Sequence, residues 1–308
     1  MTSAEGYPTA AGVEAAIKAA AQSAAAKEPA LSIAERIRLE SFRRFLSRVF
    51  SDGAESEWVL KGGTGILARI PTARATRDVD LFRSGYPLDT ALADLRRLAA
   101  IDLHDHFRFE YVGHQQSIGG DAQPYTDGYR VSFAVFIGAN ARGTLNVDLA
   151  SGAGLTTEVT STEPASALRL PRLTSYPFRL YPVVDQIADK VCATLADYVG
   201  RPSTREKDLV DLVAFAATHD IDGDALSVAL ASEIRRRRLP HPDRFTVPVD
   251  WGRGYSRLAA RVPACTRYRS IADASELAAR LIDPALSGAS RGRTWLHQTS
   301  GWADTATP

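Results

Sequence analysis

The sequence predicts an α/β (α+β) protein, in which a small mixed sheet in an N-terminal domain is followed by a helical C-terminal domain. Three observations support this class. Short apolar segments that alternate with polar residues lie before Pro164, and apolar residues recur at helical spacing after Pro182. A proline-rich stretch separates the two regions. We therefore expect a domain boundary between residues 1–180 and 181–308.

Each expected element follows from local periodicity or from its capping and turn residues. Ser32 and Glu35 have the spacing of a capping box, which predicts the start of a helix. Leu145, Val147 and Leu149 alternate with polar residues, which is the period of a half-buried strand. Helices are expected over residues 13–26, 33–50, 64–70, 184–198, 205–219, 224–238 and 272–282. Strands are expected over residues 58–60, 78–82, 107–112, 129–137 and 144–149.

Composition excludes several classes of protein. The chain has 308 residues, 45% hydrophobic and 24% charged, as in a globular protein with a buried core. Its net charge of +1 does not indicate any class of binding partner. Two cysteines are too few for a disulfide framework. We find no signal-peptide pattern and no apolar run of the roughly 18 residues that a membrane span needs, so we expect a cytoplasmic protein without a membrane partner.

An Asp-x-Asp pair is the first candidate for chemistry. Asp78 and Asp80 are two apart on an expected strand, so their carboxylates share one face while Val79 and Leu81 enter the core. Two adjacent carboxylates repel each other unless a cation lies between them, and hard oxygen ligands are those that Mg²⁺ prefers. The pattern predicts a magnesium site. The alternative is an ordinary solvated strand.

A glycine turn precedes this pair by a short interval. Gly62 and Gly63 have no side chain to keep a phosphate away, and Thr64 then opens a helix with free N–H groups. The preceding residue, Lys61, adds a positive charge. A phosphate cradle beside a metal site is the arrangement needed to bind a nucleoside triphosphate.

Three further residues are candidates with open alternatives. Asp148 lies on the polar face of an expected strand, where it is either a third metal ligand or a solvent-facing acid. Lys190 lies at the edge of the apolar stripe of one helix, and Asp211 interrupts a run of large aliphatic residues in the next. These two either form a structural salt bridge between the helices or take part in the site.

The ordered set of motifs resembles that of the AbiEii/AbiGii nucleotidyltransferase toxins, especially the mycobacterial MenT type. The resemblance covers roughly residues 59–217. It rests on Lys61-Gly62-Gly63-Thr64, Arg74-x-Thr76-x-Asp78-x-Asp80, the strand containing Asp148, Gln186-Ile187-Ala188-Asp189-Lys190, and Arg205-x-x-Asp208-x-x-Asp211-Leu212.

The resemblance implies a polymerase-β-like nucleotidyltransferase domain and a helical domain. It also implies an Mg²⁺-dependent toxin that transfers a nucleotide from an NTP to the tRNA 3′ end, with a cognate antitoxin as partner. By the same resemblance, Asp78 and Asp80 hold metal, Lys190 contacts the nucleotide phosphates, and Asp211 completes the catalytic set. We place Lys61 and Arg77 among the nucleotide-binding residues.

A basic segment follows the matched region. Residues 231–270 hold ten arginines against three acids, with Trp251, Tyr255 and Tyr268 interleaved. Arginines contact phosphates and aromatic rings stack on bases, so the segment is either an RNA contact or a solvated surface. The expected RNA-binding residues are Arg235, Arg236, Arg237, Arg238, Arg253 and Arg257.

Two alternative functions and one regulatory site complete the expectations. The same chemistry could serve a protein or small-molecule hydroxyl, or the fold could be a non-catalytic nucleotide-binding scaffold. The intact Asp-x-Asp pair and Lys190 argue against the scaffold. Thr76 lies two residues before Asp78, where a phosphate would compete for Mg²⁺ and repel a triphosphate. Alternatively, Thr76 caps the loop.

Overall fold

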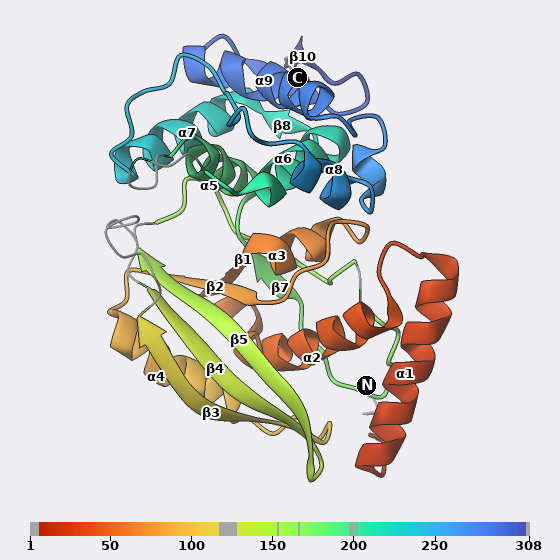
Figure 1. The fold of residues 1–308 in the computed structure, drawn as a ribbon. Helices are drawn as coiled ribbons and strands as arrows, with labels where there is room; N and C mark the ends of the chain where they lie inside the picture. Colours follow the sequence, from red (N-terminus) through yellow and green to blue (C-terminus); the bar gives the residue numbers. More distant parts are fainter. Residues whose placement is uncertain are drawn as a thin grey trace.

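The computed structural model describes residues 6–116, 128–152, 154–165, 167–196, 200 and 203–305. A mixed sheet and its helices form the N-terminal region, and the C-terminal helical region lies on one side of it, next to α3 (Figure 1). The expected α/β class with a helical C-terminal region is confirmed.

The large sheet has seven strands in the order β3-β4-β5-β2-β1-β7-β6. The β2–β5 and β1–β7 pairs are parallel and the other pairs are antiparallel, so the sheet is mixed. The strands are β1 (Trp58–Lys61), β2 (Val79–Ser84), β3 (Phe107–Gln116), β4 (Gly128–Ile137), β5 (Asn140–Gly152), β6 (Thr160–Thr162) and β7 (Phe178–Leu180). The two short strands β6 and β7 were not expected, because three residues carry no readable period.

Helices α1 (Ala10–Lys27), α2 (Ile33–Val49) and α4 (Leu88–Ala99) share a hydrophobic core with this sheet. A short 3₁₀ helix, η1 (Gly53–Glu55), follows α2. The capping box at Ser32 and Glu35 is formed in both directions. Helix α4 was missed by the sequence reasoning, although its buried stripe is clear once the helix is seen.

The C-terminal region contains α5 (Val183–Leu195), α6 (Glu206–Thr218), α7 (Gly223–Arg236), α8 (Arg253–Ala259), η3 (Pro263–Cys265) and α9 (Ile271–Ser287). It also holds an unexpected antiparallel sheet in the order β10-β9-β8, made of β8 (Ile221–Asp222), β9 (Arg293–Leu296) and β10 (Gly301–Asp304). The end expected for the first of these helices, Tyr198, lies outside the described residues. None of the helices that the structure describes is long and apolar enough to cross a bilayer.

Helix α3 (Gly62–Arg69) joins the two regions. It connects to β1 at the middle of the large sheet, yet Ile66 and Leu67 pack into the core formed by the C-terminal helices. The glycine-rich start of α3 is therefore held where the sheet meets the helical region.

Candidate active site

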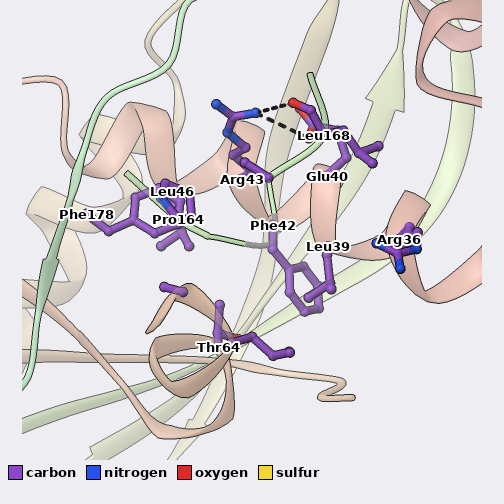
Figure 2. A pocket seen from close by; sticks show the side chains of 13 residues that line it. Arg36, Leu39, Glu40, Phe42, Arg43, Leu46, Thr64, Pro164, Leu168 and Phe178 are labelled. Carbon is purple, nitrogen blue, oxygen red and sulfur yellow. Dashed lines mark hydrogen bonds and ion pairs between the residues drawn. The ribbon is translucent and has the colours of Figure 1, made fainter. Parts of the chain in front are cut away.

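A cleft of about 760 Å³ lies between the large sheet and the C-terminal helices. Strands β1, β2 and β5 contribute Lys61, Asp80 and Asp148 to one side, and α5 and α6 contribute Lys190 and Lys207 to the other. A second cavity, of about 30 Å³, lies between α2, α3 and the loop residues Pro164, Ala167 and Leu168 (Figure 2). The second cavity has room for little more than one water molecule, so it cannot admit a nucleotide, whereas the cleft has room for one.

The glycine turn at the start of α3 is shaped by close packing. Gly62 has φ of +62°, and a Cβ there would overlap the Asp80 carboxylate. A Cβ on Gly63 would lie 2.9 Å from the Thr76 hydroxyl oxygen. No side chain caps α3, so the first N–H groups of the helix remain available to an anion. The backbone of Gly62 therefore packs directly against the Asp80 carboxylate.

Strand register assembles the carboxylates. Asp80 pairs with Lys61 on β1 and with Asp148 on β5, and directly opposed residues of neighbouring strands share a face. Val79 and Leu81 are fully buried on the opposite face, as alternation predicts. Asp78 lies just before β2, and its backbone carbonyl accepts hydrogen bonds from two threonine hydroxyls, at 2.9 Å from Thr64 and 3.3 Å from Thr76.

The pKa values of Asp80 and Asp148 are both raised above the ordinary value of an aspartate. Burial raises the pKa of Asp80 to about 6; the Lys61 ammonium works against this rise, and the Asp148 carboxylate adds to it. Burial likewise raises the pKa of Asp148, against the Arg130 guanidinium, and the Asp78 carboxylate adds to the rise. Both groups therefore lie in surroundings that disfavour the ionised form, which a bound cation would reverse.

The donor chemistry fits magnesium. Asp80 and Asp148 on adjacent strands, with Asp78 just before β2, offer hard oxygen ligands of the kind Mg²⁺ takes. At present Arg130 lies among them, with Nη2 3.0 Å from Asp78 Oδ1 and Nε 3.7 Å from Asp148 Oδ1. Within the described ranges no three His, Cys, Asp or Glu side chains are already arranged as a metal site. Arg130, which the sequence reasoning missed, is thus the competing cation.

Lys190 and Asp211 belong to a buried ion network. Lys190 Nζ lies 2.6 Å from Asp211 Oδ2 and 3.1 Å from Asp208 Oδ1, and all three side chains are almost fully buried. Arg74 binds Asp211 in a bidentate manner at 2.7 and 2.9 Å, while Arg205 lies 2.5 Å from Asp208. Burial works to lower the pKa of Lys190, but Asp208 and Asp211 outweigh it and hold the pKa above its ordinary value.

The network leaves Lys190 one role in the cleft. An ammonium has three N–H donors, of which two are engaged by the carboxylates. Lys190 also lines the cleft, and no third partner is found among the residues described. Its remaining donor can therefore serve a ligand. Asp211 instead holds Lys190 and Arg74 in place.

Three expected site residues need correction. Arg77 is exposed and does not line the cleft, because it lies in the loop before β2. Thr64 lines the small cavity, since its buried side chain turns back to the Asp78 carbonyl. Arg237 lines the cleft but is buried and paired with Glu233 and with Asp189, the latter at 2.6 Å, because the end of α7 packs against α5.

The remaining expected arginines differ in position. Arg236 is half-buried and also paired with Glu233. Arg235, Arg238, Arg253 and Arg257 are exposed, and Arg257 lines the cleft. The four consecutive arginines therefore do not form one basic patch.

An α/β fold with a glycine turn packed on paired carboxylates, under a cleft lined by cations, is the arrangement of a nucleotidyltransferase. The chain belongs to the AbiEii nucleotidyl transferase toxin family of type IV toxin–antitoxin systems, whose family model matches residues 44–286. The expected toxin family is thereby confirmed, and the protein is a nucleotidyltransferase toxin.

Two crystal structures from Helicobacter pylori resemble the chain. One is of a candidate nucleotidyltransferase, at 16% identity, with a TM-score of 0.43 over 82% of this chain and 96% of that chain. The other is of JHP933, at 15% identity, with a TM-score of 0.43 over 84% of this chain and 96% of that chain. A comparison with curated proteins found no match.

Proposed function

We propose that the protein transfers a nucleotide from an NTP to an RNA hydroxyl, with the tRNA 3′ end as acceptor, and releases pyrophosphate. The acceptor is that of the MenT-type toxins that the sequence resembles. The observation that carries the proposal is the register of Asp80, which lies between Lys61 and Asp148 and against Gly62 at the floor of the cleft.

Asp78 and Asp80, with Asp148, would hold Mg²⁺. When bound there, the ion lowers the pKa of an attacking hydroxyl and offsets the charge of departing pyrophosphate. Gly62 and Gly63 let the triphosphate approach the backbone, and the free N–H groups of α3 attract it.

Lysines from both sides of the cleft position the triphosphate. Lys190 offers the third donor of its ammonium, held in place by Asp208 and Asp211. Lys61 and Lys207 line the cleft as well, and both lower the pKa of Asp80 through their charge. Most of the rate enhancement then comes from orientation and electrostatic stabilisation.

The RNA would approach along α8. Arg257 lines the cleft and Arg253 is exposed at the start of the same helix. These arginines can contact phosphates of an acceptor strand whose 3′ end reaches Asp80. Arg235 and Arg238 extend the exposed positive charge at the end of α7.

The deciding experiment supplies the purified chain with Mg²⁺, total RNA and each NTP in turn, and sequences the RNA 3′ ends. The proposal expects added nucleotides on tRNA with the wild type and none with Asp80→Asn. Parallel incubations with total protein and with small hydroxyl compounds cover the other acceptors, and label found only there would refute an RNA acceptor.

The partner follows from the toxin class. We propose a cognate antitoxin that keeps the enzyme inactive in the cell. Growth should stop when the chain is expressed alone, and should continue with Asp80→Asn or with the antitoxin co-expressed. Normal growth with the wild-type chain at full expression would argue against toxicity.

A further inference from the structure

Arg74 is a cleft residue whose guanidinium is only partly used inside the protein. It lies in the loop before β2 and lines the cleft, and its side chain is 13% exposed. Its Nε and Nη2 donate hydrogen bonds of 2.9 and 2.7 Å to the two carboxylate oxygens of Asp211. This bidentate pairing fixes the plane of the guanidinium and therefore the position of its third nitrogen, Nη1.

The third nitrogen of Arg74 faces the glycine turn. Nη1 lies 3.7 Å from the position that a Cβ of Gly63 would take. No acceptor for Nη1 is found in the part of the chain that the structure describes, and Nη1 is not among the buried polar atoms that lack a partner, so it reaches solvent. Because Arg74 lines the cleft, two N–H groups are available to a ligand beside the phosphate cradle.

The ion network around Asp211 has an excess of positive charge. Lys190 Nζ lies 2.6 Å from Asp211 Oδ2, and Arg74 Nη2 lies 2.7 Å from the same oxygen, so two cations are held side by side. With Arg205 they make three positive charges against the two carboxylates of Asp208 and Asp211, which leaves a net charge of +1. Like charges repel strongly where water is excluded, so an anion that contacts both Arg74 and Lys190 is stabilised there.

The glycine turn sets the order in which the phosphates of a nucleotide lie. A Cβ on Gly62 would overlap Asp80, whereas a Cβ on Gly63 would meet Thr76 and then Arg74. The turn therefore leads from the Asp80 carboxylate toward Arg74. In the proposed reaction the bond between the α-phosphorus and the oxygen that joins it to the β-phosphate breaks, so the α-phosphate lies at Asp80. The phosphates beyond it, which leave as pyrophosphate, then extend over Gly63 toward Arg74.

We propose that Arg74 binds the pyrophosphate part of the donor NTP through Nη1, together with Lys190, and so makes the cleft specific for triphosphates. The inference rests on the proposed function, because it assigns a binding role within the same cleft. Asp211 holds both cations through one oxygen, which accounts for an acid buried at this position. As the bond to the α-phosphorus breaks, its electron pair stays with the departing pyrophosphate, and the guanidinium offsets that charge.

The test measures nucleotide binding by calorimetry with the full chain and Mg²⁺, so it needs no acceptor. The tri-, di- and monophosphates of each of the four nucleosides are compared, the weaker ones by competition with the NTP that binds. The wild type should bind the triphosphate at least about tenfold tighter than the monophosphate. Arg74→Lys keeps the charge beside Asp211 but loses the planar guanidinium, so it should reduce this ratio about tenfold and leave the Kd of the monophosphate unchanged. The phosphate whose removal no longer weakens binding is the one that Arg74 contacts.

Two further variants control for the structural role of the ion pair. Arg74→Gln removes the charge as well, so it should lose the same ratio with a larger fall in melting temperature. Arg48→Lys changes a guanidinium that pairs with Asp105 at 2.7 Å, is fully buried and does not line the cleft. It should lower the melting temperature and leave every nucleotide affinity unchanged. Melting curves also show that each variant is folded.

The outcomes distinguish the two levels of inference. If the wild type binds no nucleotide, the proposed function fails and the Arg74 contact fails with it. If folded Arg74→Lys keeps the wild-type ratio, or the wild type binds all three phosphate forms equally, the contact is refuted while the proposed function stands. Equal weakening of all three forms in Arg74→Lys would also refute the contact, since a purely structural role has that effect. Arg74→Gln is judged by the same criteria if Arg74→Lys does not fold.

Discussion

Replacing Lys190 with methionine should destabilise the fold as well as impair nucleotide binding. Lys190 Nζ lies 2.6 Å from Asp211 and 3.1 Å from Asp208, and both carboxylates are fully buried. Removing one partner of a buried ion pair costs about 3–5 kcal/mol, since it leaves an uncompensated buried charge. Arg74 and Arg205 still pair with the two aspartates, so we expect the lower end, about 3 kcal/mol.

The expected loss can be read from thermal and urea unfolding. At about 2 °C per kcal/mol for a chain of this size, the melting temperature should fall by roughly 6 °C. Lys207→Met is a matched stability control, because Lys207 is an exposed lysine on the neighbouring helix and should shift melting little. An unchanged melting temperature together with a raised nucleotide KM would refute the structural half of the argument.

Acid should narrow the gap between wild type and Lys190→Met. Burial works to raise the pKa of Asp211, but Lys190 and Arg74 outweigh it and hold the pKa below its ordinary value of 3.8. A lowered carboxyl pKa contributes stability above about pH 4 that is lost as the pH falls through the folded-state value. The difference in unfolding free energy should therefore be full at pH 7 and shrink below about pH 4, and a gap that widens in acid would contradict this.

Four more predictions follow from the site. Asp80→Asn should abolish nucleotide transfer without lowering the melting temperature, because burial already disfavours the Asp80 charge; transfer at the wild-type rate would exclude Asp80 as a metal ligand. Gly62→Ala should destabilise the chain by about 1–3 kcal/mol and remove activity, because the alanine must keep a left-handed φ and its Cβ overlaps the Asp80 carboxylate. A variant that is as stable as the wild type in urea unfolding and fully active in the transfer assay would disprove the close packing. Changing Arg253 and Arg257 together to glutamine should weaken RNA binding and leave nucleotide affinity unchanged. The slope of log RNA affinity against log salt concentration should become about 2 less steep, and an unaltered slope would show that α8 does not contact RNA. Thr76→Glu should lower transfer activity while Thr76→Ser retains it, because the Thr76 hydroxyl lies next to Gly63 and the Asp78 carbonyl; a fully active glutamate variant would rule out control by phosphorylation there.

The sequence alone predicted those features that depend only on residues close together in the chain. The burial of Val79 and Leu81 follows from alternation along a strand and is observed, whereas the strand begins one residue after Asp78, so the shared face of Asp78 and Asp80 stays a prediction. The capping box at Ser32 spans only three residues and is formed. Short strands such as β6 and β7 were missed, because three residues hold too little of a pattern.

The candidate site could be predicted in part for the same reason. Lys61, Gly62 and the paired aspartates lie within twenty residues of one another, and their order also matched a known set of motifs. Arg130 could not be assigned a role in this way. A single arginine in a strand is ordinary, and its role depends on the side chains that lie opposite.

By itself, the sequence determined the α/β class, the glycine turn beside the Asp-x-Asp pair, and the family resemblance. Only the tertiary structure decided that Asp148 lies beside Asp80, that Lys190 is held between two buried aspartates, and that Arg237 turns inward. The physical reason is the separation of the partners along the chain. Periodicity fixes which face a side chain occupies, whereas its partner is chosen by strand register and helix packing, which form only when distant segments bury their apolar surfaces together.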